Sequence, residues 1–250
     1  MSAHLALRSG NPALTANTFT RVPPLAGHES MTITGTVNKT AMSLIVLLVA
    51  AMFVWDKGAQ GQLPMFWVWG GVIGGFAVAM VTTFKPVWAP YTTPLYAALE
   101  GLALGGISYV FEQMYPGIVA QAVFLTFGTL GALLFAYRSG IIRATENFKL
   151  GVFAATGGIG LVYLLSFVLG FFGISVPLIH SSGTFGILFS VFVVVIAALN
   201  LVLDFDFIEQ GAERGAPKYM EWYGAFGLLV TLVWLYLEIL RLLAKLQSRD

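Results

Sequence analysis

Residues 191–209 read VFVVVIAALNLVLDFDFIE, an apolar run that leads directly into Asp204, Asp206 and Glu209. A carboxylate on an apolar helix costs roughly 2.5–3.5 kcal/mol at the middle of a bilayer on insertion scales. Such a residue therefore usually faces a protein interior or a water-filled path rather than lipid. Asp204 stands at the end of the apolar run and is the first candidate for a functional residue.

The composition is that of a membrane protein. Of the 250 residues, 58% are hydrophobic and only 10% are charged, whereas soluble domains carry about 25% charged residues. The formal net charge of +1 gives no basic surface for nucleic acid. The chain contains no cysteine, which excludes disulfides, thiolate metal sites and cysteine nucleophiles.

The apolar residues gather in runs long enough to cross a hydrocarbon core of about 30 Å, which takes about 20 helical residues. Only helices and closed barrels satisfy their backbone hydrogen bonds in lipid, and these runs lack the alternation of barrel strands. We therefore predict an all-α integral membrane protein with a seven-helix transmembrane domain over residues 39–246. Residues 1–38 are predicted to be a disordered cytoplasmic tail. The predicted spans are 40–55, 64–84, 92–111, 117–137, 150–173, 183–203 and 222–243.

Basic residues are distributed unevenly between the connectors. With seven spans, the tail and the second, fourth and sixth connectors share one side and carry nine Lys or Arg residues, against Lys57 alone in the opposite connectors. This bias places the N-terminus in the cytoplasm. In this orientation the basic residues near the C-terminus lie outside the cell, against the usual excess of Lys and Arg on the cytoplasmic side. They are Arg241, Lys245 and Arg249. A last segment that enters the membrane and returns would remove this conflict.

Small residues recur at helical spacing, which predicts close helix packing where lipid gives no hydrophobic drive for association. The pairs are Gly70 with Gly74, Gly71 with Gly75, and Gly101 with Gly105.

The third span carries an acid near its centre. Thr93, Tyr96, Glu100 and Ser108 fall along one helical stripe, which should face the bundle interior. Glu100 either fixes packing, as a protonated or hydrogen-bonded group, or serves in transport.

A second polar stripe runs along the sixth span and ends at Asp204. Its members lie within about 40° of one another around the helix. They are Ser190, Ala197, Asn200 and Asp204. Asp206 points elsewhere, and we interpret Asp206 and Glu209 as a solvated end of the helix.

The seventh span ends in an acid followed by a base. Glu238 lies three residues before Arg241, close enough for an i,i+3 ion pair that anchors the helix end. The other small or polar residues on the same face of the seventh span suggest that it is an interior helix. These are Gly224, Gly227 and Thr231.

Several classes of protein are excluded by what the spans lack. The histidines are His4, His28 and His180, so no His cluster for a metal and no Ser–His pair is expected within the membrane. No lysine precedes Lys245 in the last span to form a mid-membrane Schiff base. The sequence gives no reason to expect an enzyme.

Three segments together resemble the Bax inhibitor-1/YccA family of membrane proteins. ALNLVLDFDFIEQG (198–211) resembles its sixth-helix signature, YAALEGLALGGIS (96–108) its Gly-rich third helix, and AFGLLVTLVWLYLEILRLL (225–243) its last helix. NPALTANTFTR (11–21) resembles an actinobacterial branch of predicted membrane proteins. The resemblance covers roughly residues 40–245.

The resemblance implies a bundle in which the last helix is surrounded by the other six, in a bacterial inner membrane. It also implies a pH-gated Ca²⁺ leak controlled by two aspartates on the sixth and seventh helices that share a proton. Asp204 matches the first aspartate, but Thr231 stands where the second would be. Because Thr cannot act as a like-charge partner, the shared proton does not carry over intact. Glu238 or Glu221 would have to substitute for it.

We therefore expect a pH-sensitive cation leak channel or transporter, with Ca²⁺ as the ion and no cofactor, gated near the cytoplasmic ends of the sixth and seventh helices. The lipid bilayer is the expected partner. Candidate gating residues are Asp204, Thr231 and Asn200; candidate ion-pathway residues are Glu100, Glu238, Asp206 and Glu221; candidate metal ligands are Asp204 and Glu100.

Two alternatives remain open. The first is a non-transporting membrane scaffold that regulates a partner such as a membrane protease through the N-terminal tail. The second is a proton-coupled transporter of small solutes in which Glu100 couples the proton.

Overall fold

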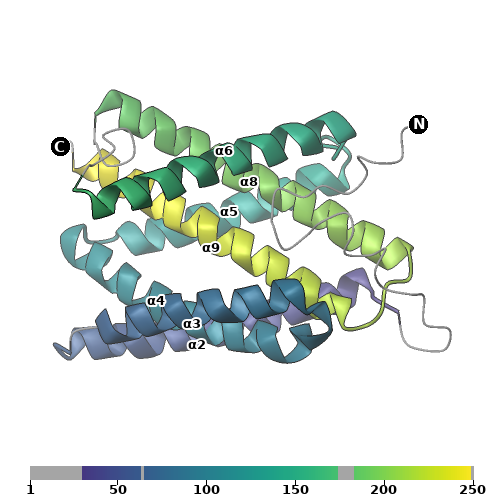
Figure 1. Ribbon diagram of the computed structural model, residues 1–250, viewed down its shortest axis with the longest axis horizontal. Coiled ribbons are helices and arrows are strands. Elements are labelled where there is room, and N and C mark those ends of the chain that lie inside the picture. The colour runs from purple at the N-terminus through teal and green to yellow at the C-terminus, as the bar shows by residue number, and fades with distance from the viewer. Residues whose placement is uncertain (1–29, 63–64, 174–182, 249–250) are drawn as a thin grey trace. The chain divides into compact units, whose positions relative to one another are not determined.

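The computed structural model describes residues 30–62, 65–173 and 183–248, and its helices follow the predicted apolar runs (Figure 1). They are α2 (Ile33–Ala59), α3 (Met65–Phe84), α4 (Ala89–Met114), α5 (Ile118–Arg138), α6 (Glu146–Phe171), α8 (Thr184–Glu213) and α9 (Met220–Gln247), with a short 3-10 helix η1 (Pro86–Trp88) before α4. All seven α-helices are long and apolar enough to span a membrane. Within these described ranges, extended pairing is limited to an isolated bridge between Ser30 and Pro217. The predicted all-α membrane fold is confirmed.

α2 and α8 extend furthest beyond the hydrophobic runs that predicted them. α2 begins at Ile33, where the hydroxyl of Thr32 caps the helix by accepting the Gly35 N–H at 2.9 Å. The predicted tail over residues 1–38 is therefore corrected: residues 33–38 are helical, and residues 1–29 lie outside the described part. α8 continues past residue 203 to Glu213. Hydropathy marks only the lipid-facing length of a helix, whereas 30 helical residues extend for about 45 Å.

The last segment is one continuous helix. α9 runs for 28 residues without interruption, so the alternative of a segment that enters and returns is not what the chain forms. In its most apolar window, 67% of α9 is buried, against 11–50% for the other six helices. This burial agrees with the interior helix that the small and polar residues of the last span predicted.

The described residues form two compact units, each treated by itself. Unit 2 comprises the described parts of Asn17–Pro116 and Asp206–Val230, and unit 1 the described parts of Gly117–Phe205 and Thr231–Asp250. Both α8 and α9 thus contribute residues to each unit.

Unit 2 is built on close contacts between glycine-bearing helices, with α4 packed against both α2 and α3 (Figure 1). A Cβ added at Gly71 would lie 2.5 Å from the Leu99 carbonyl oxygen, and one at Gly105 would lie 2.8 Å from the Ala51 Cα. The predicted close packing is therefore confirmed at these positions. Gly70 differs, because a Cβ there would meet nothing within 4 Å.

Unit 1 has a compact apolar cluster where α6 and α8 meet. Ile159, Val193 and Ile196 are buried at its centre. Partly buried residues pack around them, including Tyr163 of α6 and Trp234 of α9. This cluster packs α8 against α6. The polar stripe that leads to Asp204 lies on the same helix, α8.

Candidate functional site

The polar stripe of α8 is buried along its whole length in unit 1. Ser190, Ala197, Asn200 and Asp204 are between 0% and 2% exposed. Asn200 is fixed by its Nδ2, which donates to the Thr156 hydroxyl of α6 and to the Ile196 carbonyl, both at 2.8 Å. The stripe predicted to face the protein interior therefore does so, and it ends at a fully buried carboxyl group.

Asp206 and Glu209 are in a different environment from Asp204. Both are partly exposed, in contrast to the 0% exposure of Asp204. Asp206 Oδ2 accepts a hydrogen bond from Gln210 Nε2 at 2.6 Å, and Arg214 donates to Gln210 Oε1 at 3.2 Å. These side chains form a ladder along the C-terminal end of α8.

Thr231, at the position where the resemblance places a second aspartate, is 2% exposed in unit 1. Its hydroxyl is a neutral group, so a buried pair of like-charged side chains cannot form at this position. Any pH-dependent change at the Asp204 end of α8 has to operate without a carboxylate at residue 231.

Glu238 is held in an ion pair inside unit 1. Its carboxylate is 2% exposed and accepts a hydrogen bond from Arg241 NH1 at 2.8 Å and one from the Tyr163 hydroxyl at 2.9 Å. Arg241 NH1 also donates to the Tyr163 oxygen at 2.9 Å. The i,i+3 pair predicted from the sequence is confirmed, and Tyr163 of α6 is a third member that the sequence did not reveal.

Lys245 is a buried base whose contacts could not be predicted from the sequence. It is 7% exposed, and its ammonium group donates to the Gly186 carbonyl at 3.1 Å and to the Ser190 hydroxyl at 2.9 Å. Ser190 begins the polar stripe of α8, so the stripe has a buried cation at one end and a buried acid at the other.

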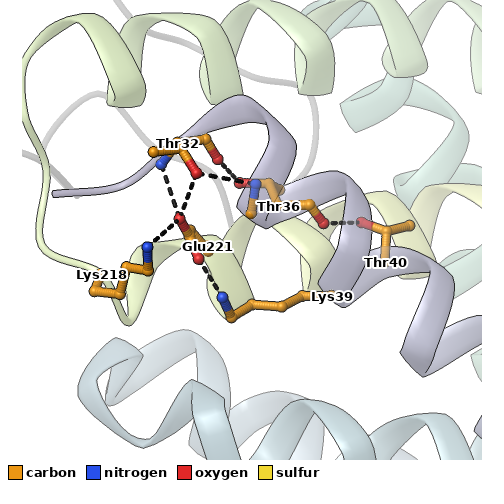
Figure 2. A network of polar contacts seen from close by, with 7 residues as sticks. Thr32, Thr36, Lys39, Thr40, Lys218 and Glu221 are labelled. Carbon is orange, nitrogen blue, oxygen red and sulfur yellow. Dashed lines mark hydrogen bonds and ion pairs between the residues drawn. The ribbon is translucent and has the colours of Figure 1, made fainter. Parts of the chain in front are cut away.

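Glu221 is a fully buried acid of unit 2 with several polar contacts (Figure 2). Its Oε1 accepts hydrogen bonds from the Thr32 main-chain N–H at 2.9 Å and from the Thr32 hydroxyl at 2.8 Å. Its Oε2 is paired with the ammonium group of Lys39, and Lys218 lies 3.4 Å from Oε1. The network ties the start of α9 to the first turns of α2.

Gly35 is what lets Glu221 approach α2 so closely. A Cβ at this position would overlap with all three atoms of the Glu221 carboxylate group. The sequence predicted a role for Glu221 but not its contacts with Thr32, Gly35 and Lys39, because these residues lie more than 180 residues away along the chain. The available signal was a lysine, Lys39, at the edge of an apolar run.

Glu100 lies on the α3–α4 contact of unit 2 and is partly buried. A Cβ at Gly75 would lie 2.6 Å from Glu100 Oε2, so the glycine provides the space for the carboxylate. Thr93 and Tyr96, from the same predicted stripe, are buried. The Thr93 hydroxyl donates to the Trp222 carbonyl at 3.1 Å, and Tyr96 packs edge to face on Phe226 with the ring centroids 5.0 Å apart.

The acids do not gather into a metal centre in the part of the chain that the structure describes, where no group of three or more His, Asp or Glu side chains could hold an ion. His4, His28 and His180 lie outside the described residues. The predicted ligands Asp204 and Glu100 lie in unit 1 and unit 2 respectively.

Comparison with known proteins gives a match to one family. A family model described as Bax inhibitor 1 like matches residues 11–248. No curated protein and no solved structure gives a match.

Proposed function

The chain belongs to the Bax inhibitor 1 like family of membrane proteins, and on this premise we propose that it is a pH-sensitive cation leak pathway for Ca²⁺. Its seven candidate spans make it a multi-pass membrane protein. In the proposal, the gate lies at the Asp204 end of α8, and Asn200 and Thr231 are its neutral polar residues.

The observation that carries the proposal is the burial of Asp204. The residue is 0% exposed at the end of a buried polar stripe on a membrane-spanning helix. Removing a carboxylate from water disfavours its charged form, so ionisation favours any conformation that gives the group water or a cationic partner. A proton on Asp204 would then favour the closed state over the open state. A buried titratable group acts as a switch in this way.

The contacts of the other acids favour a gate with a single carboxylate. Glu238 is paired with Arg241, and Glu221 is paired with Lys39 and Lys218. Each therefore has its own cationic partner. We propose that Asp204 responds to pH without the second acid that the family resemblance implied.

The chemistry of the interior suits a hard cation. Ca²⁺ takes oxygen ligands, and the chain offers carboxylates, hydroxyls and backbone carbonyls but no thiolates. Among the described residues no three or more acidic or His side chains gather to hold an ion, so the ion would be passed along rather than stored, because a tight Ca²⁺ site takes about six to eight oxygen ligands.

The proposed orientation places the N-terminus in the cytoplasm of a bacterial cell. The basic C-terminal residues were the exception to this orientation. Arg241 is paired with Glu238, and Lys245 donates to Gly186 and Ser190 inside unit 1. These two cations are therefore engaged within the protein, and the proposed orientation rests on the charges of the connectors.

Reconstitution tests the proposed function. The purified protein is placed in liposomes that contain a Ca²⁺ indicator, and external Ca²⁺ is added at several pH values. We expect Ca²⁺ entry above that of protein-free liposomes, with a rate that depends on pH. Entry equal to that of protein-free liposomes at every pH would contradict the proposal and favour the scaffold alternative.

A further inference from the structure

Lys245 is a buried base that the proposed gate does not use, and it lies at the edge of unit 1. It is the last buried residue of α9 among those described, since residues 246–248 are at least partly exposed. Gly186, whose carbonyl oxygen accepts a hydrogen bond from the Lys245 ammonium group at 3.1 Å, is the first buried residue of α8. This contact therefore lies where the buried interior of unit 1 ends.

The ammonium group of Lys245 is held by neutral acceptors. Besides the carbonyl of α8, it donates to the Ser190 hydroxyl at 2.9 Å, and among the described residues Lys245 forms no ion pair. Glu238, an acid of the same helix, is paired with Arg241. Burying a cation without a carboxylate partner costs free energy, and a long side chain recovers part of this cost when its charged end reaches water. The contact is therefore a tie that a small rearrangement can open.

Behind this tie the buried face of α8 continues toward Asp204. Val193 follows Ser190 on this face and is 0% exposed, and Asn200 comes two turns later. The side-chain oxygen of Asn200 is buried and accepts no hydrogen bond from the described residues. A buried acceptor of this kind is satisfied when a water molecule or a cation reaches it. The face behind Lys245 therefore holds a polar group that an open tie would serve.

We propose that Lys245 is a second gate residue, at the opposite end of the buried face of α8 from Asp204. While its ammonium group is bonded to Gly186 and Ser190, the face behind it is closed to water; when the side chain leaves, water and small cations reach that face. The use of this face for ion passage rests on the proposed function. A lysine suits a gate for cations, because its positive charge repels a cation that enters at the same end. The two gates are about 21 Å apart along the helix, measured from Ser190 to Asp204.

Cysteine protection in the purified full-length protein tests the proposal, because the natural chain has no cysteine. Single cysteines replace Val193, directly behind the tie, and Val202, which is also 0% exposed but lies about 180° away around α8. Each is made with Lys245 present and with Lys245→Met, which keeps most of the side-chain length but not the charge. The rate of labelling by a small cationic methanethiosulfonate, which enters through water, is measured in detergent. If Lys245→Met does not fold, Lys245→Gln takes its place.

We expect Val193→Cys to be protected when Lys245 is present and to react at least about tenfold faster in Lys245→Met, because the loss of two hydrogen bonds shifts the local opening equilibrium. Val202→Cys should stay protected in both. An equal rate for Val193→Cys with and without Lys245 would overturn the proposal. Equal acceleration of both cysteines in Lys245→Met would overturn it as well, because Lys245 would then be a structural tie whose loss loosens the whole unit.

The outcome is separable from that of the proposed function. Labelling requires no ion flux, so a protein that carries no Ca²⁺ in liposomes can still show protection that depends on Lys245. If the wild type does carry Ca²⁺, Lys245→Met should raise the rate of entry severalfold. A wild-type rate of entry in Lys245→Met, together with a protected Val193→Cys, would remove Lys245 from the pathway and leave a gate at Asp204 untouched.

Discussion

At the scale of single residues, the buried charged side chains are accommodated by partners of opposite charge or by hydrogen bonds. Charged groups are rarely buried unless they are paired. Three buried charged residues of this protein obey the rule: Glu221 contacts Lys39, Glu238 contacts Arg241, and Lys245 donates to a carbonyl and a hydroxyl. Removing Lys39 or Arg241 would leave a buried carboxylate without that partner.

Gly35→Ala should destabilise the protein. The added Cβ would overlap with the carboxylate of Glu221, so that side chain would have to leave Thr32 and Lys39. We expect a loss of about 1–3 kcal/mol, as for other overpacked positions, measured by thermal unfolding in detergent. Gly128→Ala is the matched control, because a Cβ at Gly128 meets nothing within 4 Å. Equal stability of Gly35→Ala and Gly128→Ala would contradict the Glu221 network.

The sequence predicted those site features that depend on local spacing. The buried stripe from Ser190 to Asp204 and the Glu238–Arg241 pair both follow from helical periodicity, and both are present. The partners of Glu221 and Lys245 could not be predicted in this way. Lys39 lies 182 residues from Glu221 and Ser190 lies 55 residues from Lys245, and a single sequence gives no spacing rule over such distances.

At the scale of helices, polar side chains fix neighbouring elements to one another where apolar packing alone gives no unique register. In unit 1, Tyr163 of α6 bonds to both members of the Glu238–Arg241 pair of α9. In unit 2, the Thr93 hydroxyl of α4 donates to the Trp222 carbonyl of α9. The apolar runs predicted which segments are helices, but the ends of α2 and α8 are set by a cap and by backbone hydrogen bonds beyond the lipid-facing length.

Tyr163→Phe tests the tie between α6 and α9. The ring remains to pack against Phe189, while the hydroxyl shared by Glu238 and Arg241 is lost. Hydrogen bonds to charged groups contribute about 1.5–3 kcal/mol, so we expect a lower melting temperature with pH-dependent Ca²⁺ entry retained. Tyr91→Phe is the control, because Tyr91 is 82% exposed. A Tyr163→Phe melting temperature equal to that of Tyr91→Phe would show that the tie is unimportant.

At the scale of the whole molecule, the family match and the seven spanning helices agree with what the sequence alone predicted. Composition and run length were sufficient for this, since the bilayer allows few alternatives to helices. The orientation in the membrane rests on connector charges and is a proposal with a direct test.

Cysteine labelling tests the orientation, because the natural chain has no cysteine that would react in the background. Single cysteines replace Gln62 after α2, Ile141 between α5 and α6, and Ser248 after α9. In intact cells stripped of their outer layers, a membrane-impermeant maleimide should label Gln62→Cys and Ser248→Cys but not Ile141→Cys. Permeabilised membranes should allow labelling at all three. Labelling of Ile141→Cys alone in intact cells would reverse the orientation.

The measurement that tests the central claim most directly is the pH dependence of Ca²⁺ entry for wild type and Asp204→Asn in liposomes. Asn resembles the protonated acid in shape and charge, so Asp204→Asn should leak at the acidic-limit rate of wild type at every pH. Glu209→Gln, which changes a partly exposed acid of the same helix, should keep the wild-type pH dependence. A pH dependence of Asp204→Asn equal to that of wild type would contradict the account of Asp204 as the gate.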